Sequence, residues 1–179
     1  AKPDIVAVQE VDQSTKRSRG VNQAAKLSEL TGLQVAFGKA MDFQNGEYGI
    51  ALLSRWPIQD VQVHSLPAPA GTEPRVLLTA HIQPGESAPA FRMGVTHVDH
   101  RDDPTQRTAQ IAKIRELLPV SGASEPTILA GDFNDTPDSA VIKGLVTEWA
   151  DSTAGKGFLT YSSDKPEMQI DYIFYRHTT

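Results

Sequence analysis

The stretch ILAGDFNDTP, residues 128–137, carries the strongest signal in this sequence. Residues 127–130 are a short apolar run, which is typical of a buried strand. A glycine ends the run, and Asp132, Phe133 and Asn134 follow. Alternate residues of an extended chain point to the same side, so we predict that Asp132 and Asn134 share one side while Phe133 anchors in the core. Gly, Asn, Asp and Pro are also common turn residues, so this stretch alone leaves a turn and a functional site both open.

The composition indicates an ordinary globular domain. The chain has 179 residues, of which 39% are hydrophobic and 22% are charged. The formal net charge of −5 argues against a protein that coats nucleic acid through phosphate contacts. Cysteine is absent, which excludes disulfides and thiolate chemistry. No segment reaches the roughly 18 consecutive apolar residues of a membrane span.

Hydrophobic periodicity and turn residues predict alternating strands and helices. We expect strands at residues 5–8, 33–37, 48–54, 58–66, 127–130 and 169–175, and a hairpin of residues 75–82 and 91–98. We expect helices at residues 22–30, 103–118 and 137–145, the second with a capping box of Asp103 and Gln106. The pattern predicts one α/β domain with mixed sheets over residues 1–179.

Polar side chains stand at the ends of three further predicted strands. Glu10 closes the first strand, His97 lies in THVDH, and Asp171 lies inside the apolar run QIDYIF. Each has an ordinary explanation: a solvated strand end, a structural histidine, or an acid held by a turn or an arginine. An acid inside an apolar strand, however, needs a partner if it is buried. Because α/β folds build sites at the ends of core strands, we predict that these side chains converge.

Five motifs resemble those of one known superfamily. VAVQEV, GIALLSRWPI, GVTHVDH, ILAGDFNDTP and QIDYIF occur in this order along nearly the whole chain. They are similar to the endonuclease/exonuclease/phosphatase superfamily, the metal-dependent phosphoesterases that include deoxyribonuclease I and inositol-phosphate 5-phosphatases. The resemblance implies an α/β fold with four layers, α/β/β/α, in which two mixed sheets are flanked by helices.

The resemblance also implies roles for three residues of the predicted site. Glu10 matches the family's glutamate that binds a divalent metal, Mg²⁺ or Mn²⁺, and carboxylate oxygen suits these hard ions. Asp132 matches the aspartate that orients or deprotonates the attacking water. Asn134 matches the asparagine that holds the scissile phosphate.

Three more residues acquire roles from the same resemblance. His97 matches the histidine that donates a hydrogen bond to a phosphoryl oxygen. Asp171 resembles the aspartate that orients a histidine near the C-terminus. Arg75, in TEPRVLL, stands where some members place an arginine that contacts the substrate phosphate.

Two elements of the family pattern have no counterpart in this sequence. The family begins with a strand that ends in asparagine and closes with a Ser-Asp-His strand, so we expect this domain to lack the first and last strands of the fold. His177 stands too close to Asp171 to replace the closing histidine. Missing strands would expose strand edges and apolar faces, so we predict a homodimer or a larger assembly, and weak catalysis by this chain alone.

The function predicted from these residues is metal-dependent hydrolysis of a phosphoester, by a phosphodiesterase or phosphatase with a small or lipid-derived substrate. The sequence has no basic stripe interleaved with aromatic residues. A nuclease acting on DNA or RNA is therefore the less favoured alternative. A fragment that only binds a ligand or partner is a second alternative. The sequence makes no prediction about localisation.

Overall fold

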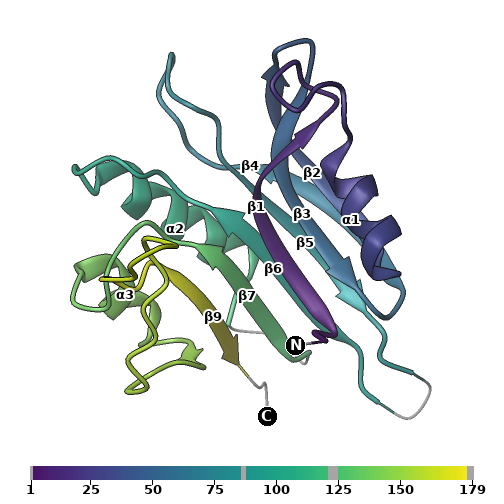
Figure 1. Ribbon diagram of the computed structural model, residues 1–179. Coiled ribbons are helices and arrows are strands. Elements are labelled where there is room, and N and C mark those ends of the chain that lie inside the picture. The colour runs from purple at the N-terminus through teal and green to yellow at the C-terminus, as the bar shows by residue number, and fades with distance from the viewer. Residues whose placement is uncertain (1, 86–87, 121–124, 177–179) are drawn as a thin grey trace.

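The computed structural model describes residues 2–85, 88–120 and 125–176. Two β-sheets face each other in it (Figure 1). The smaller sheet is antiparallel and has the strand order β1-β3-β2. Its strands are β1 (Ile5–Gln13), β2 (Gln34–Phe43) and β3 (Gly46–Ser54).

The larger sheet has six strands in the order β4-β5-β6-β7-β9-β8. They are β4 (Ile58–Ser65), β5 (Val76–Ile82), β6 (Phe91–His97), β7 (Thr127–Asp132), β8 (Ala150–Asp151) and β9 (Asp171–Arg176). β6 and β7 pair in parallel, and the other neighbours pair antiparallel, so this sheet is mixed. The predicted hairpin of β5 and β6 is confirmed.

Helices cover the outer faces of both sheets. α1 (Gln23–Thr31) packs on the smaller sheet, where Ala24 joins Val11 and Leu53 in one apolar cluster. α2 (Thr105–Leu117) and α3 (Ala140–Leu145) pack on the larger sheet, as Figure 1 shows. The predicted four-layer α/β/β/α sandwich is therefore confirmed.

The two sheets are held together by an apolar cluster between them. Ile50 and Leu52 of β3 meet Leu78 of β5 and Val95 of β6, and all four side chains are buried. Burying an aliphatic side chain of this size stabilises a fold by about 1.5–3 kcal/mol. β3 is the middle strand of the smaller sheet and is buried along most of its length. β1 and β2 pair with the two edges of β3, so β3 sets the position of the smaller sheet against the larger one.

The largest difference from the predicted elements is a hairpin formed by β2 and β3. We expected a short strand at 33–37, whereas β2 continues to Phe43 and turns directly into β3. The two turn residues, Gln44 and Asn45, both have positive φ. This is the conformation of a type I′ hairpin turn, and asparagine is one of the residues that favour it.

Other boundaries differ by a few residues. β1 continues past its predicted end at Val8 to Gln13, and β7 continues to Asp132. β8 was not predicted, because two residues carry no periodicity. The predicted capping box is wrong: α2 begins at Thr105, and the Asp103 carboxylate accepts hydrogen bonds from the backbone N and hydroxyl of that residue.

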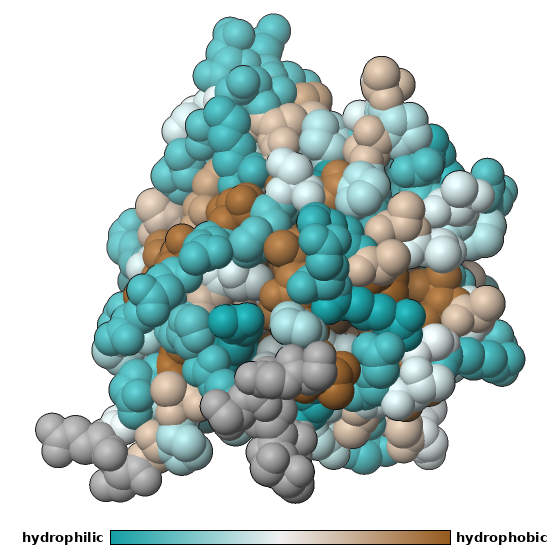
Figure 2. All heavy atoms as spheres, turned by 180° about the vertical axis from the view of Figure 1, so that it is seen from behind, coloured by the Kyte–Doolittle hydropathy of each residue, from teal (hydrophilic) through white to brown (hydrophobic). Residues whose placement is uncertain are grey.

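The face seen from behind is mainly hydrophilic, with small hydrophobic patches between the polar residues (Figure 2). None of the helices in the described ranges has the length and apolar character needed to cross a membrane.

One edge of the smaller sheet has no strand beside it. Among the described strands, β1 pairs only with β3. Its first residues, Ile5 to Gln9, include neither a charged residue nor proline, the usual protections of an exposed edge. Ile173 of β9, on the opposite sheet, is exposed beside this edge. These features support the expectation of self-association, which stays a prediction.

We expect the chain to run as a dimer or larger species in size-exclusion chromatography with light scattering, because unpaired strand edges and exposed apolar side chains promote association. The molar mass should exceed the 19.5 kDa of one chain and rise with loading concentration. A constant mass of one chain across a hundredfold concentration range would contradict the prediction.

Candidate functional site

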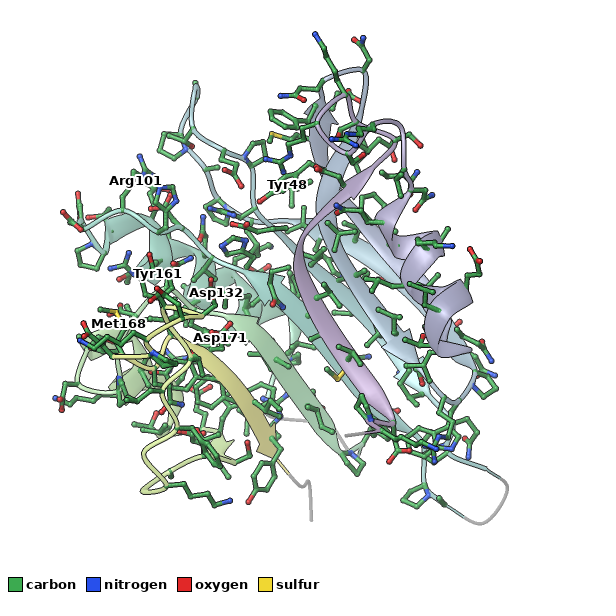
Figure 3. All side chains as sticks on the ribbon, viewed as in Figure 1. Tyr48, Arg101, Asp132, Tyr161, Met168 and Asp171 are labelled. Carbon is green, nitrogen blue, oxygen red and sulfur yellow. The ribbon has the colours of Figure 1, made fainter. Side chains whose placement is uncertain are left out.

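Three of the predicted site residues form one row across the larger sheet. The parallel pairing of β6 and β7 sets His97 opposite Asp132, and the antiparallel pairing of β7 and β9 sets Asp132 opposite Asp171. Cross-strand partners project from the same face of a sheet. That face looks toward the smaller sheet, because Val95 and Ala130, two residues earlier on β6 and β7, belong to the cluster between the sheets. Figure 3 shows Asp132 and Asp171 side by side at the strand ends.

The glycine before Asp132 is needed for this row. A Cβ atom on Gly131 would lie 2.0 Å from the carbonyl oxygen of Thr96, so only glycine lets β7 approach β6 here. Phe133 then anchors the end of the strand, as predicted. Its buried ring packs edge-on against Tyr172 and Phe174, with centroid distances of 5.7 and 5.1 Å. The position of Asp132 is therefore fixed from both sides.

Asn134 reaches the site through a turn. The prediction that it continues an extended chain with Asp132 is wrong, because β7 ends at Asp132 and Asn134 has φ +48°. Its backbone N donates to Asp132 Oδ1 at 2.8 Å, which is an Asx-type turn. Its Nδ2 donates to the carbonyl of Val98 at 3.0 Å. One of the two amide hydrogens is used in that bond, and the other is left for a ligand.

Glu10 approaches the row from the smaller sheet. It lies where the pairing of β1 with β3 shifts register, between Val8 and Val11, and it has φ +56°. A non-glycine residue in this conformation costs about 1–3 kcal/mol, so the bulge is a strained feature. The Glu10 side chain is exposed, and its negative charge contributes to raising the pKa of Asp132.

The Asp132 carboxyl has a pKa raised to about 6. The main cause is burial, and the negative charges of Asp171 and Glu10 add to it. The backbone hydrogen bond from Asn134 and the charge of Arg75 act in the opposite direction. A carboxylate with this pKa is ionised at neutral pH and accepts a proton more readily than an exposed aspartate.

His97 is a buried, neutral imidazole, with 6% of the residue exposed. Its pKa is lowered to about 3, mainly by burial and in addition by the positive charge of Arg75. Its Nε2 lies 3.7 Å from Asp132 Oδ2, which is too long for a hydrogen bond. The two groups are therefore neighbours without a direct hydrogen bond between them.

Arg75 lies behind the histidine, with 4% of the residue exposed. Its Nη1 is 2.8 Å from Glu73 Oε1 and 3.0 Å from His97 Nδ1. Its Nη2 is 3.3 Å from His100 Nδ1. Protein groups thus occupy both terminal nitrogens of the guanidinium, whereas the buried Nε has no hydrogen-bond partner among the described residues. The predicted phosphate contact of Arg75 stays a prediction.

Two residues near the site were not predicted, Tyr48 and Glu73. The pKa of Tyr48 is raised to about 12, mainly by burial and in addition by the charges of Glu73 and Glu10. The phenol therefore stays protonated and can donate a hydrogen bond. Figure 3 labels Tyr48 at the start of β3. Two features of the sequence could have identified these residues. Tyr48 is a hydroxyl-bearing residue at the start of the otherwise apolar run YGIALL, and Glu73 is an acid two residues before Arg75.

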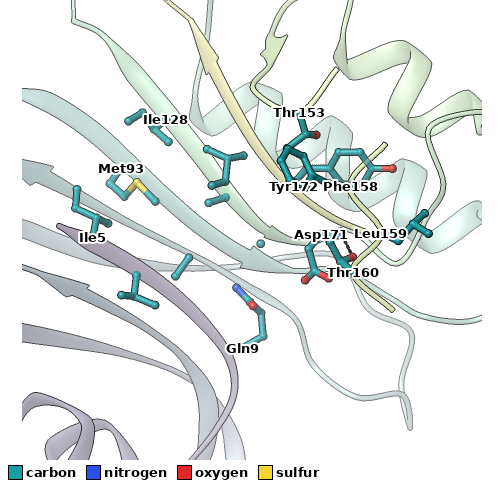
Figure 4. A pocket seen from close by; sticks show the side chains of 15 residues that line it. Ile5, Gln9, Met93, Ile128, Thr153, Phe158, Leu159, Thr160, Asp171 and Tyr172 are labelled. Atoms are coloured by element: carbon teal, nitrogen blue, oxygen red, sulfur yellow. Dashed lines mark hydrogen bonds between the residues drawn. The ribbon is translucent and has the colours of Figure 1, made fainter. Parts of the chain in front are cut away.

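A groove of about 660 Å³ adjoins Asp171. It is lined by β1, β7, β9 and residues 158–160, and Figure 4 shows Gln9 and Asp171 on its facing sides. One wall is the edge of β1 that has no neighbouring strand. An apolar ligand would bury the peptide groups of that edge without hydrogen bonds, at a cost in free energy. We therefore do not assign the groove to the substrate.

The acidic residues suit a hard divalent cation in their chemistry. Over residues 2–85, 88–120 and 125–176, no cluster of three or more acidic or histidine side chains has a metal-binding arrangement. Mg²⁺ commonly uses only one or two carboxylates and fills its other positions with water and substrate phosphate. Glu10, with an aspartate of the row, fits that donor set. His177 lies outside the described residues, so its predicted lack of a role is not addressed.

A family model described as the endonuclease/exonuclease/phosphatase family matches residues 1–179. The chain belongs to this family. Its members hydrolyse phosphoester bonds, and the row of His97, Asp132 and Asp171 lies on the motifs that carried the resemblance.

Relatives of known sequence or structure are longer than this chain. The protein YbhP of Escherichia coli K12, whose function is uncharacterised, is 26% identical over 157 residues, 86% of this chain and 61% of its own length. The human Nocturnin catalytic domain with bound sulfate is 25% identical and superposes with a TM-score of 0.73. The match covers 97% of this chain and 69% of that chain. The mannosyl-6-phosphatase Bt3783 of Bacteroides thetaiotaomicron is 20% identical, with a TM-score of 0.75. The match covers 96% of this chain and 70% of that chain. The chain thus spans about 61% of the length of the curated relative.

The raised pKa of Asp132 predicts a pH-dependent stability difference for Asp132→Asn. In the unfolded chain the carboxyl ionises near pH 3.8, whereas in the folded protein it ionises near pH 6. The wild type therefore loses stability as pH rises from about 4 to 6, and the amide does not. Without divalent cations, the variant should unfold with a free energy up to about 3 kcal/mol higher at pH 7.5 and no higher at pH 3.5. Urea titrations at both pH values measure this, and equal stability at pH 7.5 would contradict it.

Proposed function

We propose that this chain contributes the site of a metal-dependent phosphoesterase, in which an activated water attacks phosphorus. The observation that carries the proposal is the row of His97, Asp132 and Asp171, which faces Glu10 across the two sheets. Phosphoester hydrolysis needs a positioned water, donors to the phosphoryl oxygens and neutralisation of charge. The residues around the row can supply each of these.

Asp132 is the residue that we propose for the water. Its pKa of about 6 leaves the carboxylate ionised at pH 7 while making it a stronger base than an exposed aspartate. Its Oδ1 is held by the backbone N of Asn134. Oδ2 faces His97 Nε2 at 3.7 Å and is free to accept a hydrogen bond from water. The fixed orientation of the carboxylate would direct that water toward phosphorus.

Donors to the phosphoryl group would come from two side chains. Asn134 keeps one Nδ2 hydrogen beyond its bond to Val98. His97 is neutral and buried, so its Nε2 can offer a hydrogen bond without adding a charge. Donors already held in place in a water-poor site cost little reorganisation during reaction and lower the barrier most effectively.

Glu10 is the residue that we propose for Mg²⁺ or Mn²⁺, together with an aspartate of the row. The cation, when bound, would neutralise negative charge on a phosphoryl oxygen. Asp171 contributes its negative charge beside Asp132. Its role toward a histidine near the C-terminus stays a prediction from the family resemblance.

The substrate that we favour is a small or lipid-derived phosphoester. The net charge of −5 disfavours a long polyanion, and a fold neighbour is named as a mannosyl-6-phosphatase. A nuclease is the alternative, because the family includes endonucleases and exonucleases. A chain that binds a ligand without catalysis is the other alternative.

The test is hydrolysis of p-nitrophenyl phosphate and bis-p-nitrophenyl phosphate in MgCl₂ or MnCl₂. Activity should disappear with EDTA, and Asp132→Asn and His97→Gln should each lower kcat by about 10²–10³. Asp138→Asn is the matched control, because the Asp138 side chain is fully exposed. Unchanged rates in the first two variants, or turnover that EDTA does not affect, would contradict the proposal.

A parallel assay separates the rivals. Nicking of supercoiled plasmid in MgCl₂, lost in Asp132→Asn, would favour a nuclease over the small phosphoester. Manganese binding, followed by electron paramagnetic resonance and weakened in Glu10→Gln, without turnover of either substrate would favour the non-catalytic binding module.

A further inference from the structure

The contacts of Arg75 determine where the hydrogens of His97 lie. Arg75 Nη1 is 3.0 Å from His97 Nδ1, in a buried contact. A guanidinium has only donors and stays protonated in proteins. The Nδ1 atom must therefore be the acceptor of this hydrogen bond, and it carries no hydrogen. His100 meets the same guanidinium in the same way, through its Nδ1 at 3.3 Å from Nη2.

A neutral imidazole that accepts at Nδ1 carries its hydrogen on Nε2. Nε2 is the His97 atom that faces Asp132. The ring therefore presents an N–H group to the row. A protonated Nε2 has no lone pair with which to take a proton from water. It can lose its proton only by forming an imidazolate, which a buried site between carboxylates disfavours. The geometry leaves hydrogen-bond donation as the chemistry of this side chain.

We propose that Arg75 is a positioning residue, which holds His97 as a neutral Nε2–H donor and so prevents it from acting as a general acid or base. The catalytic meaning of this assignment rests on the proposed function. It gives Arg75 a role different from that of a substrate contact, since both terminal nitrogens are engaged by protein groups.

Arg75 is itself held in place by Glu73. The carboxylate lies 2.8 Å from Nη1 and compensates the charge of a buried guanidinium, which would be costly without a partner. Glu73 also interacts with Tyr48, whose pKa it raises. The chain of contacts runs from Tyr48 through Glu73 and Arg75 to His97. Such supporting contacts around a site typically change activity by about 10–100-fold when removed.

The first test is a long-range ¹H–¹⁵N NMR spectrum of ¹⁵N-histidine protein without divalent cations. The chain has five histidines, and the signals of His97 are those missing in His97→Gln. We expect Nδ1 of His97 to resonate as an unprotonated nitrogen and Nε2 as a protonated one, with no change from pH 5 to 8. A hydrogen on Nδ1, or titration of His97 in this range, would overturn the assignment.

The second test compares Arg75→Met and Arg75→Gln with Arg55→Met. Arg55 is a matched control because it is half-exposed and pairs with Asp4 at 2.7 Å, away from the row. We expect both Arg75 variants to shift His97 toward a mixture of tautomers, and kcat to fall about 10–100-fold with less than a twofold change in KM. Arg75→Gln, whose amide can accept from Nδ1 as well as donate to it, serves if Arg75→Met does not fold.

The outcomes separate the two proposals. If Arg75→Met, or Arg75→Gln where the first variant does not fold, leaves the His97 tautomer unchanged, the positioning role is overturned, whatever the activity. If wild-type His97 is a fixed Nε2–H donor but no phosphoester is hydrolysed, the positioning contact stands and the proposed function fails. If KM rises tenfold or more in the variants while kcat is unchanged, Arg75 contacts the substrate and the positioning role is overturned.

Discussion

The parallel pairing of β6 and β7 is the contact on which the site depends. It sets His97 beside Asp132, and it exists only because residue 131 is a glycine that can touch the carbonyl of Thr96. β9 then joins the other edge of β7 and adds Asp171. Because the strands are held on one side by the α2–α3 cluster and on the other by β3, the row is built on rigid elements. Among the described residues, loops contribute Asn134, His100 and the segment before β5.

Burial gives these side chains their chemistry. Carboxylates taken out of water and placed near one another hold protons more tightly, so Asp132 has a raised pKa. Burial, with the positive charge of Arg75, lowers the pKa of His97, so this histidine remains neutral. Asp132, on the larger sheet, is partly buried. Glu10, on the strained bulge of β1 in the smaller sheet, is exposed. One end of the sandwich thus holds a carboxyl of raised pKa, a neutral imidazole and an exposed carboxylate.

Much of this arrangement could be predicted from the sequence. The apolar runs located most strands, and the motifs around Glu10, His97, Asp132 and Asp171 indicated which strand ends matter. The hairpin of β2 and β3 was missed because residues 38–43 mix small, charged and apolar residues without a clear period. The place of Asn134 was misjudged because an Asx turn and an extended strand share the same residue types. Glu73 was missed because its importance comes from a partner, Arg75, and not from its own sequence context.

The sequence by itself determined the family, the order of the strands along the chain, and which polar residues end them, since these depend on local composition and spacing. Only the tertiary structure decided that Asp132 is a stronger base than an exposed aspartate and that the guanidinium of Arg75 contacts His97. Proton affinities and hydrogen-bond directions depend on burial and on neighbours far away in the chain, because desolvation and charge act through space. For His97 and Arg75, 22 positions apart, only the pairing of β5 with β6 brings the two side chains into contact.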